Sequence, residues 1–304
     1  MDWQPLVEFL VYAGIGLASF LLWWVVYDHV LTRGLSTRDA VFGRTPNVAV
    51  ALDVAGGFLA MGLLNYAVIR GPRLDSFAHD VEATALSLLG TLVLLGLLRM
   101  AIAAGLRLWF GARRDAQGDR VTLNNELFKQ RNLATGLFST ALYLVLVAGL
   151  LESDLLDLSG YRLAATWNML GVWLLGLAAV LLHSWFYLGL GWREHILAES
   201  FHRNNAAAPL SLLGFLGGVL ILNHQLLPPL DAGQHLLNTL AHWEFLLLGV
   251  ASVFVLRAIL YGLLGGVLGV SVRAELLSRR NVAWGVLDGA FIFALFLILI
   301  ALIA

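Results

Sequence analysis

The chain has 304 residues, of which 60% are hydrophobic and 13% charged, with a mean hydropathy of +0.82 and a net charge of −1. Soluble domains have about 45–50% apolar and about 25% charged residues, so this composition excludes a soluble domain, a disordered chain and a nucleic-acid-binding protein. The lack of cysteine excludes disulfides, thiolate metal sites and cysteine nucleophiles. The class that remains is a polytopic membrane protein.

Long apolar runs predict an all-α fold with eight transmembrane helices. The first run is not a cleavable signal peptide, because it follows acidic rather than basic residues and is longer than a signal core. In chain order the eight runs cover residues 6–31, 47–69, 81–109, 132–151, 163–190, 206–227, 236–270 and 282–304.

The loops between these runs differ in basic charge. Loops after the odd-numbered runs contain 13 Lys and Arg residues, and the opposite face contains 3. Because cytoplasmic loops carry the excess of basic residues, we expect a multi-pass protein of the bacterial inner membrane with both termini in the periplasm.

The even-numbered runs open with the same short motif, an Asn that follows closely behind an Arg. The motif recurs at spacings of 85, 73 and 76 residues, which indicates a repeated helical hairpin. An Asn oxygen can accept hydrogen bonds from the free N–H groups of a first helical turn, so we interpret it as a helix cap; the alternative is a ligand site at four positive helix ends. The four residues are Asn47, Asn132, Asn205 and Asn281.

A larger repeat is indicated by the third and seventh runs, which contain Arg99 and Arg257 in similar surroundings. Asp53 lies six residues after one motif Asn, and Asp288 lies seven residues after another. The sequence therefore predicts two four-helix repeats, residues 1–157 and 158–304. An even number of spans in each half requires the halves to be parallel.

With this motif, the chain resembles the bacterial inner-membrane family of unknown function 350, in two tandem copies. The resemblance is carried by the four motif asparagines and covers nearly the whole chain. It implies an integral inner-membrane protein and no established activity.

Charges within the spans are the candidate functional residues, because burying charge in a bilayer costs about 2.5–3.5 kcal/mol on insertion scales. We predict that Arg99 lies near Asp53, and that Arg257 lies near Asp288, facing the bundle interior. The open alternatives are a structural ion pair, a snorkelled anchor, and a place in an ion or solute path. His183 is expected to be a hydrogen-bonded core residue rather than a ligand.

Glycines at a spacing of four residues, such as Gly214 with Gly218 and Gly285 with Gly289, predict close helix packing, with an oligomer interface as the alternative. The sequence contains no catalytic motif, so we expect no enzyme, no cofactor and no metal site.

Two functions remain: a channel-like or transporter-like protein, and a non-transporting scaffold or stress-response partner whose basic loops recruit a peripheral protein or anionic lipid. The expected partners are the lipid bilayer, a second copy of the chain and a peripheral cytoplasmic protein.

Overall fold

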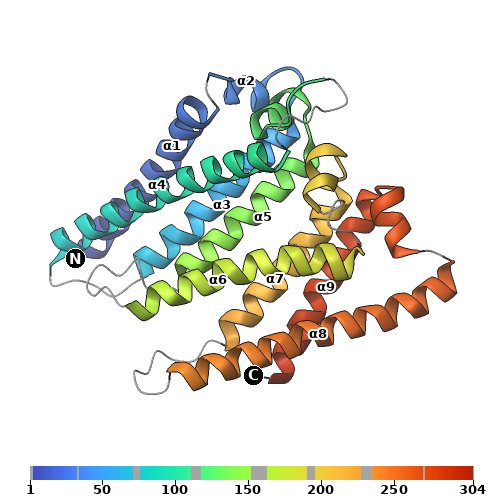
Figure 1. The fold of residues 1–304 in the computed structure, drawn as a ribbon. Helices are drawn as coiled ribbons and strands as arrows, with labels where there is room; N and C mark the ends of the chain where they lie inside the picture. The colour runs from blue at the N-terminus through green and yellow to red at the C-terminus, as the bar shows by residue number, and fades with distance from the viewer. Residues whose placement is uncertain are drawn as a thin grey trace. The chain divides into compact units, whose positions relative to one another are not determined.

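The computed structural model describes residues 3–32, 34–70, 76–110, 118–151, 163–189, 196–226, 235–269 and 271–303, and these residues are mainly helical (Figure 1). Five short π-helical segments, labelled η, accompany the α-helices. The elements are α1 (Gln4–Val25), η1 (Val26–Leu31), α2 (Thr37–Phe42), α3 (Val48–Arg70), α4 (Phe77–Phe110), η2 (Asn125–Lys129), α5 (Leu133–Leu151), α6 (Leu163–Leu182), η3 (His183–Tyr187), η4 (Ala198–His202), α7 (Ala207–Leu226), α8 (His235–Leu268), η5 (Ala274–Ser278) and α9 (Val282–Ile303).

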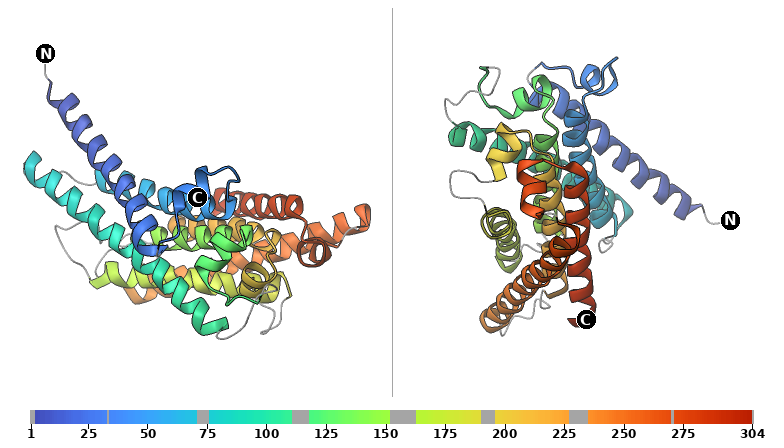
Figure 2. Two further views of the ribbon diagram at one scale, coloured as in Figure 1. Left: turned by 90° about the horizontal axis from the view of Figure 1, so that it is seen from above. Right: turned by 90° about the vertical axis from the view of Figure 1, so that its right-hand side faces the viewer.

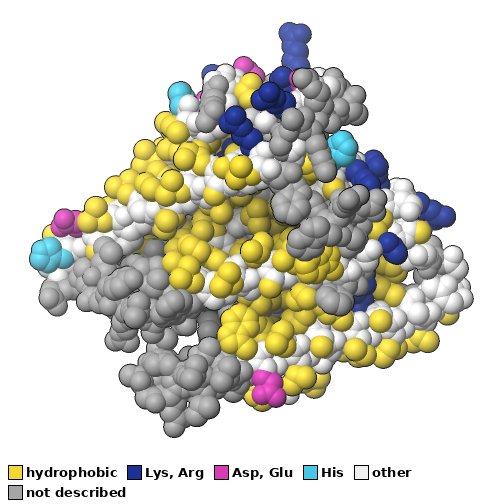
Figure 3. Space-filling view, in the orientation of Figure 1, with side chains coloured by type: hydrophobic (Ala, Val, Ile, Leu, Met, Phe, Trp, Pro, Cys, Tyr) yellow, Lys and Arg dark blue, Asp and Glu magenta, His cyan; other side chains and the backbone are white. Residues whose placement is uncertain are grey.

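Seven helical stretches in the described part of the chain are long and apolar enough to cross a membrane. The stretch predicted at 163–190 is helical from Leu163 to Tyr187, as α6 followed directly by η3, and the apolar helix found among its described residues covers Met169–Trp185. Large hydrophobic side chains such as Phe9, Leu17 and Leu21 are exposed on α1. Hydrophobic side chains also cover much of the face seen in Figure 3. The chain is therefore a multi-pass membrane protein.

The chain divides into two compact units. The first unit contains Met1–Asn132 and Leu142–Met169, and the second contains Leu133–Ala141 and Leu170–Ala304. Helix α5 contributes its first nine residues to the second unit and its remainder to the first. The repeat boundary predicted after residue 157 lies outside the described residues.

In the first unit, α1 and the η1 segment that continues it are joined to α3 and α4 by three polar contacts. Figure 2 gives two further views of these helices, drawn in blue to teal. The Tyr12 hydroxyl donates to the carboxylate of Asp80 on α4. The Asn65 amide on α3 donates to Ser19 Oγ at 2.9 Å. Further along, Tyr27 of η1 reaches α3 as described below. Tyr12, Ser19 and Tyr27 are seven and eight residues apart along α1 and η1, so they lie on one face of this continuous helix.

In the second unit, α7 and α9 pack in close backbone contact. A Cβ atom placed on Gly214 would lie 1.9 Å from the carbonyl oxygen of Gly289, and one on Gly285 would lie 2.6 Å from that of Ala207. Small residues allow such an approach, which agrees with the packing predicted for these glycines. Gly262 of α8 has open space at its Cβ position.

Candidate functional site

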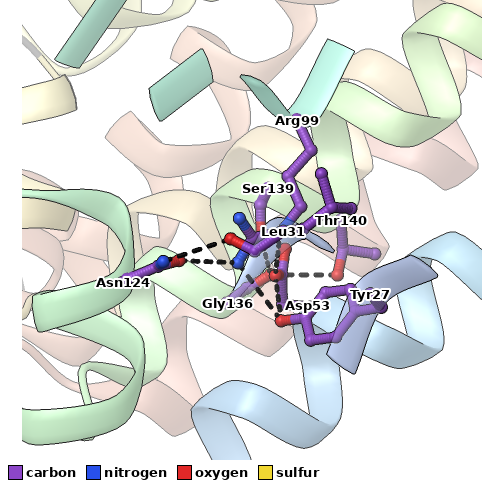
Figure 4. Close-up of polar contacts among 8 residues, drawn as sticks. All are labelled: Tyr27, Leu31, Asp53, Arg99, Asn124, Gly136, Ser139 and Thr140. Atoms are coloured by element: carbon purple, nitrogen blue, oxygen red, sulfur yellow. Dashed lines mark hydrogen bonds and ion pairs between the residues drawn. The ribbon is translucent and has the colours of Figure 1, made fainter. Parts of the chain in front are cut away.

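The first charged centre forms where α3, α4 and η1 meet. Arg99 of α4 extends its guanidinium to Asp53 of α3, with 3.1 Å between Arg99 Nε and Asp53 Oδ2. The Tyr27 hydroxyl of η1 donates to the same carboxylate oxygen at 2.5 Å. The Arg99 and Asp53 side chains are 2% and 0% exposed, so the structure brings together the first predicted pair inside the unit. Figure 4 shows the three side chains converging.

A fourth residue, Asn124, fixes the far side of the guanidinium. Arg99 Nη2 donates to Asn124 Oδ1 at 3.1 Å, while the Asn124 amide donates to the backbone carbonyl of Leu31 at 3.2 Å. Asn124 directly precedes η2, and Leu31 ends η1 (Figure 4). The charged pair is therefore held from a segment outside the long helices as well as from within them.

The second centre forms around Asp288 of α9. One carboxylate oxygen, Oδ1, lies 3.3 Å from Arg257 Nη2 on α8 and accepts from the hydroxyl of Tyr261, one turn further along that helix. The other oxygen, Oδ2, accepts from Ser211 Oγ of α7 at 2.5 Å. Asp288 is fully buried, whereas the Arg257 side chain is 11% exposed. The second predicted pair is thus also brought together.

A buried histidine extends the second centre. His183 Nε2 lies 2.9 Å from Ser211 Oγ, and both residues are fully buried. The ring of His183 also packs against Phe215, with 5.6 Å between the ring centroids. His183 is therefore a hydrogen-bonded core residue that is connected through Ser211 to Asp288.

The two centres place their polar residues at matching distances from the motif asparagines, but the acid lies on a different helix in each centre. Asp53 of α3 and Ser211 of α7 each lie six residues after a motif Asn, while Ser139 of α5 and Asp288 of α9 each lie seven residues after one. Tyr27 contacts the carboxylate of Asp53, and His183 contacts Ser211. Tyr27 belongs to the π-helical segment η1 and His183 to η3. Such segments are frequent at functional sites.

Three of the motif asparagines accept hydrogen bonds from the first turns of their helices, and three donate to a buried glutamate that was not predicted from the sequence. The Asn205 side-chain oxygen accepts a hydrogen bond from the Ala207 N–H at 3.2 Å, and the Asn281 oxygen accepts one from the Trp284 N–H at 3.2 Å. Asn47 likewise accepts from the N–H groups that follow it. The amides of Asn132, Asn205 and Asn281 donate at 2.8–2.9 Å to Glu126, Glu199 and Glu275, each six residues upstream.

The residue before each of these three asparagines has a left-handed backbone. Arg131, Asn204 and Arg280 have φ of 51°, 49° and 50°, a conformation that costs a non-glycine residue about 1–2 kcal/mol. The recurring Glu-x5-Asn spacing, visible three times in the sequence, is the signal that could have identified the glutamates.

The chemistry that these centres permit is the holding of charge and protons. Each places a carboxylate, a guanidinium and hydroxyl groups in contact inside a membrane helix bundle. Within the described residues, no three His, Asp or Glu side chains gather in a way that could hold a metal ion. Tyr27, Ser211 and Tyr261 were not predicted as members, because a hydroxyl in an apolar run leaves no charge signal.

Comparison with known proteins places the chain in a family. No curated protein and no solved structure matches it. Residues 1–153, which include Asp53, Arg99 and two motif asparagines, match the family described as Domain of Unknown Function (DUF350). Since the match covers half of the chain and agrees with the resemblance carried by the repeated Asn motif, the chain belongs to the DUF350 family.

Proposed function

We propose that this membrane protein is channel-like or transporter-like, and that its two buried Arg–Asp centres are polar positions along the path of a small ion or solute. The observation that carries the proposal is the burial of one such pair within the helices of each unit. Ionisable residues inside membrane segments are rare and mark ion paths and proton relays.

Stability alone gives no reason to bury these charges. Replacing a buried ion pair with well-packed apolar residues is often neutral or stabilising by about 1–4 kcal/mol. Each centre also binds hydroxyl groups from a further helix, Tyr27 at the first and Ser211 at the second. Such groups can exchange hydrogen bonds with a passing ion or proton, which favours a role in transport.

We further propose that the protein consists of two parallel four-helix halves with both termini in the periplasm. Contacts at matching register support the duplication. The Asn47 amide donates to the carbonyl of Leu127 and the Asn205 amide to that of Leu276, both at 2.8 Å. Each acceptor lies five residues before the next motif Asn. The excess of basic residues in alternate loops supports the orientation.

A flux assay in liposomes tests the transport proposal. Purified protein is reconstituted with an internal pH- or cation-sensitive dye, and flux is recorded under an imposed gradient. We expect flux above that of empty liposomes, and its loss in Asp53→Asn and Asp288→Asn. Asp39→Asn is the matched control, because Asp39 is an exposed aspartate on α2, outside the spans. Folded protein without flux would refute the proposal.

The competing candidate is a membrane scaffold, and the exposed basic side chains favour it. Arg279 is 69% exposed, and Arg280 also lies on the surface just before α9. Clusters of this kind attract anionic lipids. A scaffold predicts no flux, together with loss of co-purifying anionic lipid when Arg279 and Arg280 are replaced by glutamine.

A further inference from the structure

The second centre contains a continuous hydrogen-bonded chain that ends on a histidine. Ser211 Oγ donates to Asp288 Oδ2 at 2.5 Å and lies 2.9 Å from His183 Nε2. A serine hydroxyl has one hydrogen. Because that hydrogen is directed to Asp288, the Nε2 atom of His183 is the donor toward Ser211. All three side chains are buried, so the chain is shielded from solvent.

We infer that His183, Ser211 and Asp288 form a proton relay in which Asp288 is the proton-binding group. A hydronium ion that reaches His183 gives its proton to Nδ1 and leaves as water. The Nε2 proton then passes to Ser211 Oγ, while the serine's own proton passes to Asp288 Oδ2. His183 ends neutral, protonated at Nδ1, and Asp288 ends as a neutral carboxylic acid. Three bonds to hydrogen break, in hydronium, at Nε2 and at Oγ, and three form, at Nδ1, Oγ and Oδ2; the reverse sequence returns the proton to water.

Further groups around the relay come from α7 and α8. Arg257 and Tyr261 both contact Asp288 Oδ1. The Phe215 ring, which covers His183, packs on Phe254 with 5.4 Å between centroids. The relay therefore joins two titratable groups in aromatic surroundings, with one cation and one phenol at its end.

Proton uptake by Asp288 has a consequence for Arg257. The neutral acid no longer balances the guanidinium, which lies 3.3 Å away and is partly exposed. At the first centre, Tyr27 takes the place that the Ser211–His183 pair occupies here, and a phenol keeps its proton at neutral pH. The inference rests on the proposed function for its role in transport and deepens it: the ion is a proton, and the second centre is where it binds.

Infrared difference spectroscopy of the reconstituted full chain tests the relay. A pH jump to acid should produce carbonyl bands of protonated carboxyl groups, and one component of this absorption should be missing in Asp288→Asn. In Ser211→Ala and His183→Gln this component should appear about a hundredfold more slowly, since a positioned proton-transfer group contributes about 10²–10⁴-fold in rate. Ser211→Thr, which keeps the hydroxyl, should retain the wild-type rate.

Ser139→Ala is the matched control, because Ser139 is equally buried and donates within its own helix to Gly136 O at 3.0 Å; it should leave the rate unchanged. Carbonyl absorption that is identical in Asp288→Asn and wild type, or an unchanged rate in both Ser211→Ala and His183→Gln, would overturn the relay. If Asp288→Asn does not fold, the Ser211→Ala and Ser211→Thr rates decide.

The flux assay separates this inference from the proposed function. An Asp288 band that forms through the relay without any flux upholds the relay and rejects transport. Flux accompanied by a band that forms equally fast in the Ser211 and His183 variants upholds transport and overturns the relay.

Discussion

The buried Arg99–Asp53 pair predicts that losing one partner is worse than losing both. Removing one member of a buried ion pair costs about 3–5 kcal/mol, because the other charge is left uncompensated. With Arg99 only 2% exposed and Asp53 fully buried, both single variants, Arg99→Leu and Asp53→Leu, should fall in this range. The double variant that also carries Tyr27→Phe, so that no hydroxyl loses its acceptor, should lie within about 1 kcal/mol of wild type or above it.

The Asp53→Leu variant leaves a buried charge that no change of pH removes. In Asp53→Leu the orphaned guanidinium cannot lose its proton. It keeps the Asn124 oxygen at 3.1 Å as an acceptor, but no counter-charge, so its loss of stability should persist at all pH values.

Unfolding in detergent micelles, followed by tryptophan fluorescence over a denaturant series, measures these differences. Tyr27→Phe should be combined with the double variant, because the Tyr27 hydroxyl would otherwise lose its acceptor at a cost of about 1–3 kcal/mol. Arg107→Leu, at an exposed arginine near the end of the same helix, is the control and should change stability by less than about 0.5 kcal/mol. If the double variant is as unstable as the sum of the singles, the pairing argument is wrong.

Three further predictions concern the packing and topology. Asn281→Leu should lower the unfolding free energy by about 0.5–2 kcal/mol, because the helix cap is lost. A further loss of about 1–3 kcal/mol should follow because Glu275 loses its amide partner. Glu275→Gln should lower the stability less in the same thermal melt. Gly289→Ala should lower the melting temperature, because its Cβ would lie 2.5 Å from the Leu210 carbonyl oxygen; Gly262→Ala, which meets nothing, should raise stability by up to about 1 kcal/mol. A single cysteine at Ser278 in this cysteine-free chain should resist an impermeant thiol reagent in intact cells, and labelling would reverse the proposed orientation.

The membrane-spanning helices could be predicted because hydropathy acts on every residue of a span. The expected bounds agree closely with the structure for α3 and α5, where the predicted 47–69 and 132–151 compare with Val48–Arg70 and Leu133–Leu151. The π-helical segments could not be predicted, because their hydrogen-bond shift leaves the apolar composition unchanged. The stretch expected at 163–190 shows this, since the helix changes type at His183 but continues to Tyr187, close to the expected end.

The charged pairs were accessible from the sequence for an energetic reason. A lone Arg or Asp in a span is expensive, so each charge implies a partner at similar depth, and matching positions in the two halves indicate which partner. A hydroxyl residue in a span has no comparable energetic cost, so its presence does not imply a partner. Ser211 in particular is an ordinary residue in an apolar helix, and only the register that it shares with Asp53 distinguishes it. The link from Ser211 to His183 depends on tertiary packing that spacing does not encode.

The placement of acids follows from charge balance. The register offers two positions for an acid in each proposed half, one on the helix matching α3 and one on the helix matching α5. Each centre, however, has a single arginine. A second carboxylate beside the first would leave one buried negative charge without compensation, at a cost of several kcal/mol.

The chain has a serine at each position where a second acid could stand. Ser211 occupies this position on α7, beside Asp288, and Ser139 occupies it on α5. A hydroxyl in that position adds a hydrogen bond to the carboxylate and no charge. One acid for each arginine is therefore the arrangement that keeps a centre neutral, and at the second centre that same hydroxyl connects Asp288 to His183.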